Sequence, residues 1–133
     1  NEIVFIGGGA GMAPLRSQIS NLFDSNPTDR KVSFWYGARS EKELFYQDYF
    51  NFLDNSFDNF SFNVAMSDPI PTDNKQFNIG YIHEIVYTKY LKTKPNLSNI
   101  EFYLCGPPKM IEACKKLLYE IGIKSSRIMY DEF

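Results

Sequence analysis

The sequence predicts an α/β fold: a doubly wound, five-stranded parallel sheet with helices on both faces. Short apolar runs alternate along the whole chain with segments whose apolar residues recur at helical spacing. The first run, residues 3–6, is apolar at every position, as expected of a parallel strand that is covered on both faces. At 133 residues, the chain has the size of one ordinary domain.

The first half of the chain predicts three strands and two helices. The strands are expected at residues 3–6, 32–36 and 60–65. Pro14 suits the first turn of a helix, where its missing N–H costs no hydrogen bond. Ser40 and Glu43 have the spacing of a capping box and predict the start of the second helix. The apolar positions of these helices are Leu15, Ile19 and Leu22 in the first, and Leu44, Phe45, Tyr49, Phe52 and Leu53 in the second.

The second half predicts a long loop, two helices and two strands. Residues 66–78 are polar and contain two prolines, so we expect a loop there. A helix is expected from about 79 to 90, a strand at 100–104, a helix at 108–121 and a short strand at 128–130. Gly122 stands where a glycine commonly ends a helix.

Composition excludes several classes of function. The net charge is −2 and both signs are scattered, which argues against a nucleic-acid surface. One histidine, His83, and two cysteines, Cys105 and Cys114, fit no common zinc pattern, so no metal site is expected. His83 falls within a helical pattern and is expected to be a structural or surface residue rather than a catalytic one. No apolar run approaches the roughly 18–20 residues of a membrane span, so we expect no direct membrane contact.

Five loops are expected to meet at one edge of the sheet. In an open parallel sheet, ligands bind beyond the carboxyl ends of the strands, near the point where strand order reverses. The residues expected at that edge are Gly8, Gly9, Ala10, Gly11 and Met12 after the first strand, Gly37, Ala38 and Arg39 after the second, Ser67 and Asp68 after the third, Cys105, Gly106 and Pro107 after the fourth, and Phe133 after the last.

The glycine-rich first turn indicates phosphate binding rather than a purely structural turn. Small residues let the backbone approach a pyrophosphate closely, and a helix N-terminus adds free N–H groups and a favourable dipole. The turn departs from the usual dinucleotide fingerprint, because Met12 or Pro14 occupies its sixth position. No acidic residue ends the second strand, where that fingerprint places its ribose ligand.

Two charged side chains follow the second and third strands. The guanidinium of Arg39 either reaches the phosphates of a ligand or stays solvated near a helix start. The carboxylate of Asp68 either accepts hydrogen bonds from ribose hydroxyls and repels a 2′-phosphate, or opens a turn before Pro69. The sequence leaves both pairs of alternatives open.

Cys105 ends a strand directly before a glycine and two prolines. A thiol there is expected to face the ligand edge, near the positive end of the following helix. Such a position either lowers the pKa of the thiol or makes it a small, polarisable wall against a flat ring.

Taken together, these stretches resemble the pyridine-nucleotide-binding half of the ferredoxin–NADP⁺ reductase superfamily. The resemblance runs from residue 3 to 133 and is carried by GGGAGMAPLRS, YGARSEKELFY, MSDP, YLCGPPKM and a terminal aromatic residue. Residues 12–17, 34–40 and 129–133 are similar to a flavin-containing component of the bacterial sodium-translocating NADH:quinone reductases, a family within it. Residues 1–133 would then form one NAD(H)-binding domain.

The resemblance implies a hydride transfer from nicotinamide C4 to flavin N5. The turn from Gly9 to Met12 would hold the pyrophosphate, Cys105 would lie near the nicotinamide, and Phe133 would cover the flavin until the nicotinamide displaces it. Cys105 and Phe133 are thus the expected catalytic residues. Relatives that use NADP carry an arginine where this chain has Asp68, which favours NADH.

The resemblance also implies partners outside these residues. FAD would be shared with a preceding β-barrel domain, and a [2Fe–2S] ferredoxin-like domain and a membrane helix would lie earlier still. Electrons would pass toward quinone in a sodium pump, with other subunits, at the cytoplasmic face of the bacterial inner membrane. The domain alone would not catalyse the reaction.

Three alternatives stay open. One is an NADH-binding component of another ferredoxin reductase-like system, such as an oxygenase reductase. A second is an S-adenosylmethionine-dependent methyltransferase, although residues 37–39 lack the acid that such enzymes place at the end of the second strand. The third is a nucleotide-sensing module without catalysis.

Overall fold

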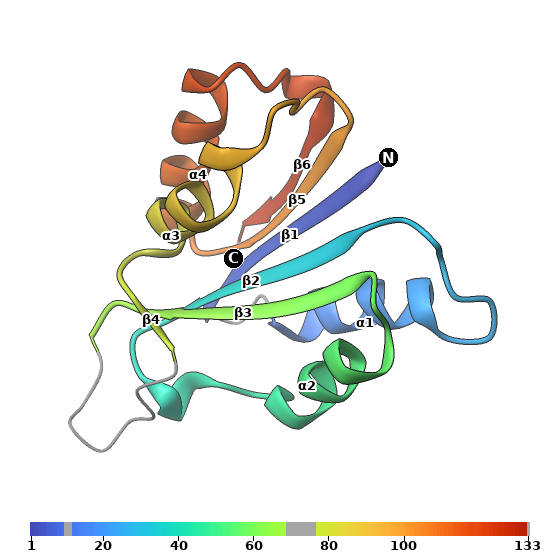
Figure 1. Cartoon of the computed structure of the whole chain (residues 1–133). Helices are drawn as coiled ribbons and strands as arrows, with labels where there is room; N and C mark the ends of the chain where they lie inside the picture. Colours follow the sequence, from blue (N-terminus) through green and yellow to red (C-terminus); the bar gives the residue numbers. More distant parts are fainter. Residues whose placement is uncertain (10–11, 69–76, 133) are drawn as a thin grey trace.

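A computed structural model describes residues 1–9, 12–68 and 77–132. One parallel sheet lies between two pairs of helices (Figure 1). The strands are β1 (Glu2–Gly8), β2 (Val32–Ala38), β3 (Phe60–Met66), β4 (Asn78–Ile79), β5 (Ile100–Gly106) and β6 (Ile128–Glu132). The helices are α1 (Met12–Phe23), α2 (Gln47–Ser56), α3 (Ile82–Lys89) and α4 (Pro108–Glu120). The predicted doubly wound α/β class is confirmed.

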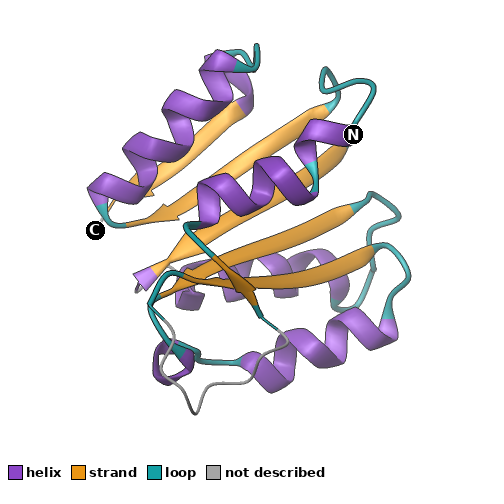
Figure 2. Cartoon of the chain, turned by 60° about the vertical axis from the view of Figure 1, so that its left-hand side comes forward, coloured by secondary structure: helices purple, strands orange, loops and turns teal. Residues whose placement is uncertain are grey.

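The sheet divides the apolar core into two layers. Successive side chains of a strand point to opposite faces, so β1 supplies both layers. Val4 and Ile6 pack on the face covered by α3 and α4, whereas Ile3 and Phe5 pack on the face covered by α1 and α2. Figures 1 and 2 show the two helix pairs on opposite sides of the sheet. Burial on both faces explains why this strand is apolar at every position.

Strand order reverses beside the first strand. The described strands are ordered β4-β3-β2-β1-β5-β6. The chain therefore moves outward from β1 through β2 and β3, and then crosses to β5 on the other side of β1. All the neighbouring strands are parallel, so their carboxyl ends share one edge. The reversal between β1 and β5 is the point where sheets of this class bind ligands.

The strand count of five was wrong, because part of the expected loop pairs with β3. Asn78 and Ile79 lie parallel to Ala65 and Met66 and form the two-residue edge strand β4. Gly80 follows with φ of +141°, and α3 begins only at Ile82 rather than near residue 79. A pairing of two residues has no periodicity that a sequence pattern can reveal.

The capping box predicted at Ser40 was also wrong. A short 3₁₀ turn, Glu41–Glu43, follows Ser40, whose side chain makes no capping hydrogen bond. Helix α2 starts later, at residue 47, after Tyr46 adopts a left-handed φ of 58°. This shift changes the buried face: Phe50 and Leu53 are buried, whereas Phe45 and Phe52 are each 61% exposed.

The glycine stop after α4 is confirmed. Gly122 has φ of +95°, which favours glycine, and its N–H donates to the carbonyl of Tyr119 at 3.1 Å. The next N–H, of Ile123, donates to the carbonyl of Leu118 at 2.9 Å. These bonds satisfy carbonyls that the end of a helix leaves open.

Glycines at two strand ends differ in how much space they leave. A Cβ added at Gly37 would lie 2.8 Å from Cβ of Ile82, a branched atom fixed at the start of α3. We therefore expect Gly37→Ala to lower the free energy of unfolding by about 1–3 kcal/mol. At Gly8 the obstacle is the flexible thioether end of Met110, so Gly8→Ala will cost less. Urea unfolding of both variants measures the difference, and equal losses would contradict this packing.

Candidate functional site

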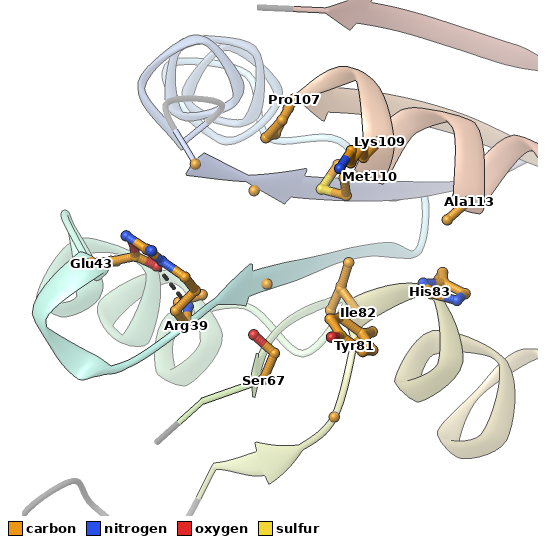
Figure 3. Close-up of a pocket in the computed structure, with 15 residues that line it drawn as sticks. Arg39, Glu43, Ser67, Tyr81, Ile82, His83, Pro107, Lys109, Met110 and Ala113 are labelled. Atoms are coloured by element: carbon orange, nitrogen blue, oxygen red, sulfur yellow. Dashed lines mark hydrogen bonds and ion pairs between the residues drawn. The ribbon is translucent and has the colours of Figure 1, made fainter. Parts of the chain in front are cut away.

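A groove of about 610 Å³ lies at the shared carboxyl edge, on the side of α3 and α4. Its volume falls in the range typical of small-molecule sites. We call this cavity the groove. It is lined by Gly8, Gly9, Gly37, Ala38, Arg39, Glu43, Ser67, Gly80, Tyr81, Ile82, His83, Pro107, Lys109, Met110 and Ala113. Figure 3 shows side chains from three separate parts of the chain facing one another across it.

The floor of the groove needs glycine because Met110 lies across two strand ends. A Cβ at Gly106 would come within 2.8 Å of Cε of Met110 and 3.2 Å of the carbonyl oxygen of Gly8. A Cβ at Gly8 would overlap the sulfur of the same side chain. The ends of β1 and β5 are thus bare backbone under one thioether, at the point where strand order reverses.

The first glycine turn is anchored from the second strand. The hydroxyl of Tyr36 donates to the carbonyl oxygen of Gly9 at 2.6 Å, and the Tyr36 ring is fully buried. Gly9 has φ of +53°, in the left-handed region. Burial, with a smaller contribution from the charge of Glu43, raises the pKa of Tyr36 to about 12. The phenol therefore stays a neutral donor that orients the Gly9 carbonyl.

The loop after β2 is organised by an ion pair. The carboxylate of Glu43 accepts the backbone N–H of Arg39 at 2.6 Å and its Nε at 3.0 Å, and a guanidinium nitrogen lies 2.9 Å away. The backbone hydrogen bond, followed by those with the guanidinium and its charge, lowers the pKa of Glu43 against the opposing effect of desolvation. Glu43 is therefore charged at neutral pH. Figure 3 shows this pair at one end of the groove.

The loop after β3 is tied to the loop after β2. The N–H of Ser67 donates to the carbonyl of Ala38 at 3.0 Å, and the N–H of Asp68 donates to the carbonyl of Arg39 at 2.9 Å. Ser67 lines the groove, whereas Asp68 is exposed and lies outside the lining. Of the described residues predicted in the first three loops, those that line the groove are Gly8, Gly9, Gly37, Ala38, Arg39 and Ser67, with Asp68 at the margin. The prediction was wrong for Met12, which is buried in the core layer of α1 and α2.

Cys105 does not face the groove. Its side chain is 2% exposed and belongs to the core layer of α1 and α2, together with Met12. Burial, followed by the charge of Asp131, raises the pKa of its thiol to about 11. The thiol is therefore not activated at neutral pH, which excludes the first of the two alternatives for this residue. Ala10, Gly11 and Phe133 lie outside the described residues.

Eight lining residues were not predicted from the sequence as part of the site, namely Glu43, Gly80, Tyr81, Ile82, His83, Lys109, Met110 and Ala113. His83, expected to be a structural or surface residue, is half-buried and lines the groove from the first turn of α3, where its ring stacks on Tyr81 with centroids 6.2 Å apart. Placing the start of α3 correctly would have indicated this position. Lys109 stands in the first turn of α4, where only the fold brings it opposite α3.

The described part of the chain shows neither a cluster of metal-binding side chains nor a helix able to span a membrane. Across residues 1–9, 12–68 and 77–132, no three acidic, histidine or cysteine side chains gather closely enough to hold a metal ion. Within those same ranges, no helix has the length and apolar character needed to cross a bilayer. The groove does supply exposed backbone at Gly9, a turn after β1 that the neutral Tyr36 hydroxyl holds in place, and the cationic side chains of Arg39 and Lys109.

Comparison with known proteins identifies relatives over the whole chain. Residues 5–116 match the model of the oxidoreductase NAD-binding domain family. The chain is 50% identical over 132 residues to the F subunit of the Na(+)-translocating NADH-quinone reductase of Idiomarina loihiensis, covering 99% of this chain and 32% of that protein. The chain thus spans about a third of the length of the curated relatives that it matches.

Solved structures agree on the fold. The Amycolatopsis cytochrome P450 reductase GcoB superposes with a TM-score of 0.81 at 25% identity, covering 100% of this chain and 38% of that one. The ferredoxin reductase in carbazole 1,9a-dioxygenase superposes with a TM-score of 0.74 at 30% identity, covering 99% and 37%.

The burial of both thiols predicts slow modification. With the pKa of Cys105 near 11 and that of Cys114 raised by burial to about 12, only about one Cys105 thiol in a thousand is ionised at pH 8. We expect a disulfide reagent at pH 8 to react about a hundredfold or more slowly with the native chain than with the urea-unfolded chain, in which two thiols titrate. Rapid reaction of one native thiol, absent from Cys105→Ser, would contradict this assignment.

Proposed function

This chain belongs to the oxidoreductase NAD-binding domain family, and from that premise we propose that its groove binds NADH and presents the nicotinamide to a flavin. The match also bears out the resemblance to the ferredoxin–NADP⁺ reductase superfamily. One observation carries the proposal: the groove lies at the strand-order reversal, beside the exposed Gly9 of the turn after β1. A glycine at that turn admits the close approach that an extended dinucleotide requires.

The pyrophosphate is proposed to lie over the turn after β1. Gly8 and Gly9 line the groove there, and α1, which begins at Met12, directs its N-terminus to the same edge. The free N–H groups and dipole of a helix start favour negative charge. Ala10 and Gly11 complete this turn in the sequence. The Tyr36 hydrogen bond supports the role by holding the Gly9 carbonyl beneath the turn.

The adenosine half is proposed to lie over the ends of β2 and β3. Ser67 and Arg39 line the groove on that side, next to the small residues Gly37 and Ala38. The carboxylate of Asp68 is proposed to accept hydrogen bonds from a ribose hydroxyl. The same negative charge would repel a 2′-phosphate, which favours NADH over NADPH.

The nicotinamide half is proposed to lie toward the end of β5, where Gly106 and Pro107 follow Cys105. Because the Cys105 thiol is buried, neutral and on the sheet face opposite the groove, its proposed part is to support the end of β5 from below as a small, polarisable group, rather than to act as a nucleophile or an acid. Phe133 is proposed to cover the flavin and to yield to the nicotinamide. The cofactors supply the hydride chemistry, and the residues of this chain position them.

The whole protein is proposed to be the F subunit of a sodium-translocating NADH:quinone reductase. The 50% identity to such a protein supports this choice over an oxygenase reductase component, for which the identity is 30%. The remaining two thirds of such a protein are proposed to carry the FAD-binding barrel, a [2Fe–2S] ferredoxin-like domain and a membrane helix. Electrons would pass from them toward quinone within a membrane complex, with this domain on the cytoplasmic side.

Binding of NADH to the 133-residue chain tests the first half of the proposal. Calorimetric titration is expected to show one saturable site, weakened about tenfold or more in Gly9→Ala, because alanine resists the φ of +53° and approaches Pro107 at 3.4 Å. Gly122→Ala is the matched control: it imposes a similar backbone cost at φ of +95°, outside the groove.

The same titration separates NADH from the competing cofactor. S-adenosylmethionine is expected not to displace NADH. Displacement at equal concentration would favour the methyltransferase alternative, and a titration without saturation would remove the dinucleotide site.

Flavin reduction in the full-length protein tests the second half of the proposal. Phe133→Ala is expected to change both the affinity for the nicotinamide and the single-turnover rate of flavin reduction by NADH, because the aromatic contact that NADH must displace, worth on the order of 1 kcal/mol, is lost. Stopped-flow absorbance measures both quantities. An unchanged rate and affinity would remove this role, and absence of any flavin reduction in the wild type would favour the sensing alternative.

A further inference from the structure

We propose that Glu43 withholds the guanidinium of Arg39 from ligands in the groove and so makes the site select a dinucleotide that lacks a 2′-phosphate. This inference rests on the proposed binding of NADH and adds a specificity-determining residue to that site. Asp68 was the sequence-based reason to expect NADH, whereas the sequence suggested only a helix-capping role for Glu43. The structure alone places Glu43 in the groove.

The contacts of Glu43 hold it in place independently of its ion pair. One carboxylate oxygen accepts the backbone N–H of Arg39 at 2.6 Å, and the other meets Nε at 3.0 Å and a terminal nitrogen at 2.9 Å. The Glu43 N–H also donates to the carbonyl of Ser40 at 3.1 Å, within the 3₁₀ turn. The Arg39 N–H therefore holds the carboxylate, the 3₁₀ turn holds the backbone of Glu43, and the guanidinium is drawn to the second carboxylate oxygen.

Exposure shows which partner controls the pair. The side chain of Arg39 is 78% exposed, whereas that of Glu43 is 33% exposed and lines the groove. A long, exposed arginine is free to move, and it adopts this position because one oxygen of the less mobile carboxylate binds both Nε and a terminal nitrogen. An exposed ion pair of this kind contributes little to folding. Its consequence is instead the direction of the only arginine in the described lining.

The pair stands where a third phosphate would meet the chain. Arg39 and Ser67 line the same end of the groove, and the N–H of Asp68 is bonded to the Arg39 carbonyl. Arginine is the side chain best suited to bind a phosphate through two parallel hydrogen bonds. Glu43 already binds Nε and one terminal nitrogen of Arg39, so a 2′-phosphate here would meet a guanidinium whose charge is offset and whose Nε edge is taken. The Glu43 carboxylate would also remain beside the phosphate as a like charge.

Asp68 and Glu43 therefore differ in what they do. Asp68 is exposed at the margin and adds a repulsive charge. Glu43 removes an attractive one by occupying the guanidinium, and this effect requires Arg39 to be present. A double-mutant cycle can separate the two mechanisms, because only withholding makes the effect of Glu43 depend on Arg39.

The test is Glu43→Gln, assayed by calorimetric titration of the chain with NADH and with NADPH. Glutamine keeps the size of the side chain and an oxygen for the Arg39 N–H, but it no longer pairs with the guanidinium. We expect the affinity for NADPH, relative to NADH, to rise about tenfold as Arg39 becomes available to the 2′-phosphate. Glu120→Gln, exposed at the far end of α4, is the control that changes net charge equally.

The Arg39→Ala background decides between withholding and simple repulsion. Arg39→Ala alone is expected to leave the NADPH:NADH affinity ratio within about twofold of wild type, since the guanidinium is already bound to Glu43. In the Arg39→Ala background, Glu43→Gln is expected not to raise the affinity for NADPH relative to NADH tenfold. Three results would each overturn the inference. The first is a gain in relative NADPH affinity that persists in the Arg39→Ala background, and the second is an NADPH:NADH affinity ratio unchanged by Glu43→Gln alone. The third is a large loss of NADPH binding in Arg39→Ala.

The two proposals fail in different ways. Wild-type chain that binds neither dinucleotide would defeat the proposed function itself. Saturable NADH binding with a ratio unaffected by Glu43→Gln would defeat only the inference about Glu43. Circular dichroism melting of each variant shows that a change in ratio comes from folded chain, and Arg39→Ala keeps the inference falsifiable even if Glu43→Gln unfolds.

Discussion

The groove depends on the close approach of two helices to the ends of three strands, which only glycine permits. Met110 of α4 lies over Gly8 and Gly106, and Ile82 of α3 lies over Gly37. Because these helices begin directly above the strand ends, their first turns become the wall of the groove rather than part of the core. A side chain at Gly37 would push against the branched Cβ of Ile82, and one at Gly8 or Gly106 would force the Met110 side chain to move. The cavity is thus a consequence of packing, and the polar groups around it are placed by that packing.

Hydrogen bonds between loops then fix what the packing brings together. Tyr36 of β2 holds the turn after β1, and the loop after β3 is bonded to the backbone of residues 38 and 39. Each of these strand-end loops is therefore anchored to a neighbouring strand or loop as well as to its own strand. A site organised before its ligand arrives spends less binding free energy on ordering itself. This preformed arrangement suits an extended ligand that must contact several loops at once.

The sequence was informative wherever the signal was local or periodic. Apolar runs located five strands, and Gly122 located a helix end, because each rests on a few neighbouring residues. It failed where the outcome depended on distant partners: β4 exists only because β3 lies beside it, and Glu43 bonds to Arg39 rather than capping a helix with Ser40. Cys105 shows a further limit of prediction from the sequence. Strand alternation puts it on the face opposite Leu104, but which face would carry the groove depends on where α3 and α4 pack.

The uneven distribution of charge along the edge fits the chemistry proposed for it. Charged side chains gather at the ends of β2 and β3, where Arg39, Glu43 and Asp68 are joined by hydrogen bonds. At the end of β5, burial keeps the thiol of Cys105 neutral. A hydride transfer needs no side chain to give or take a proton, so a neutral surface is sufficient there. The discrimination between dinucleotides, in contrast, concerns one phosphate at the adenosine end. In the proposed arrangement, selection and reaction would be separated along the groove, so that a change in the charged loop would alter which cofactor binds without disturbing the proposed place of the ring.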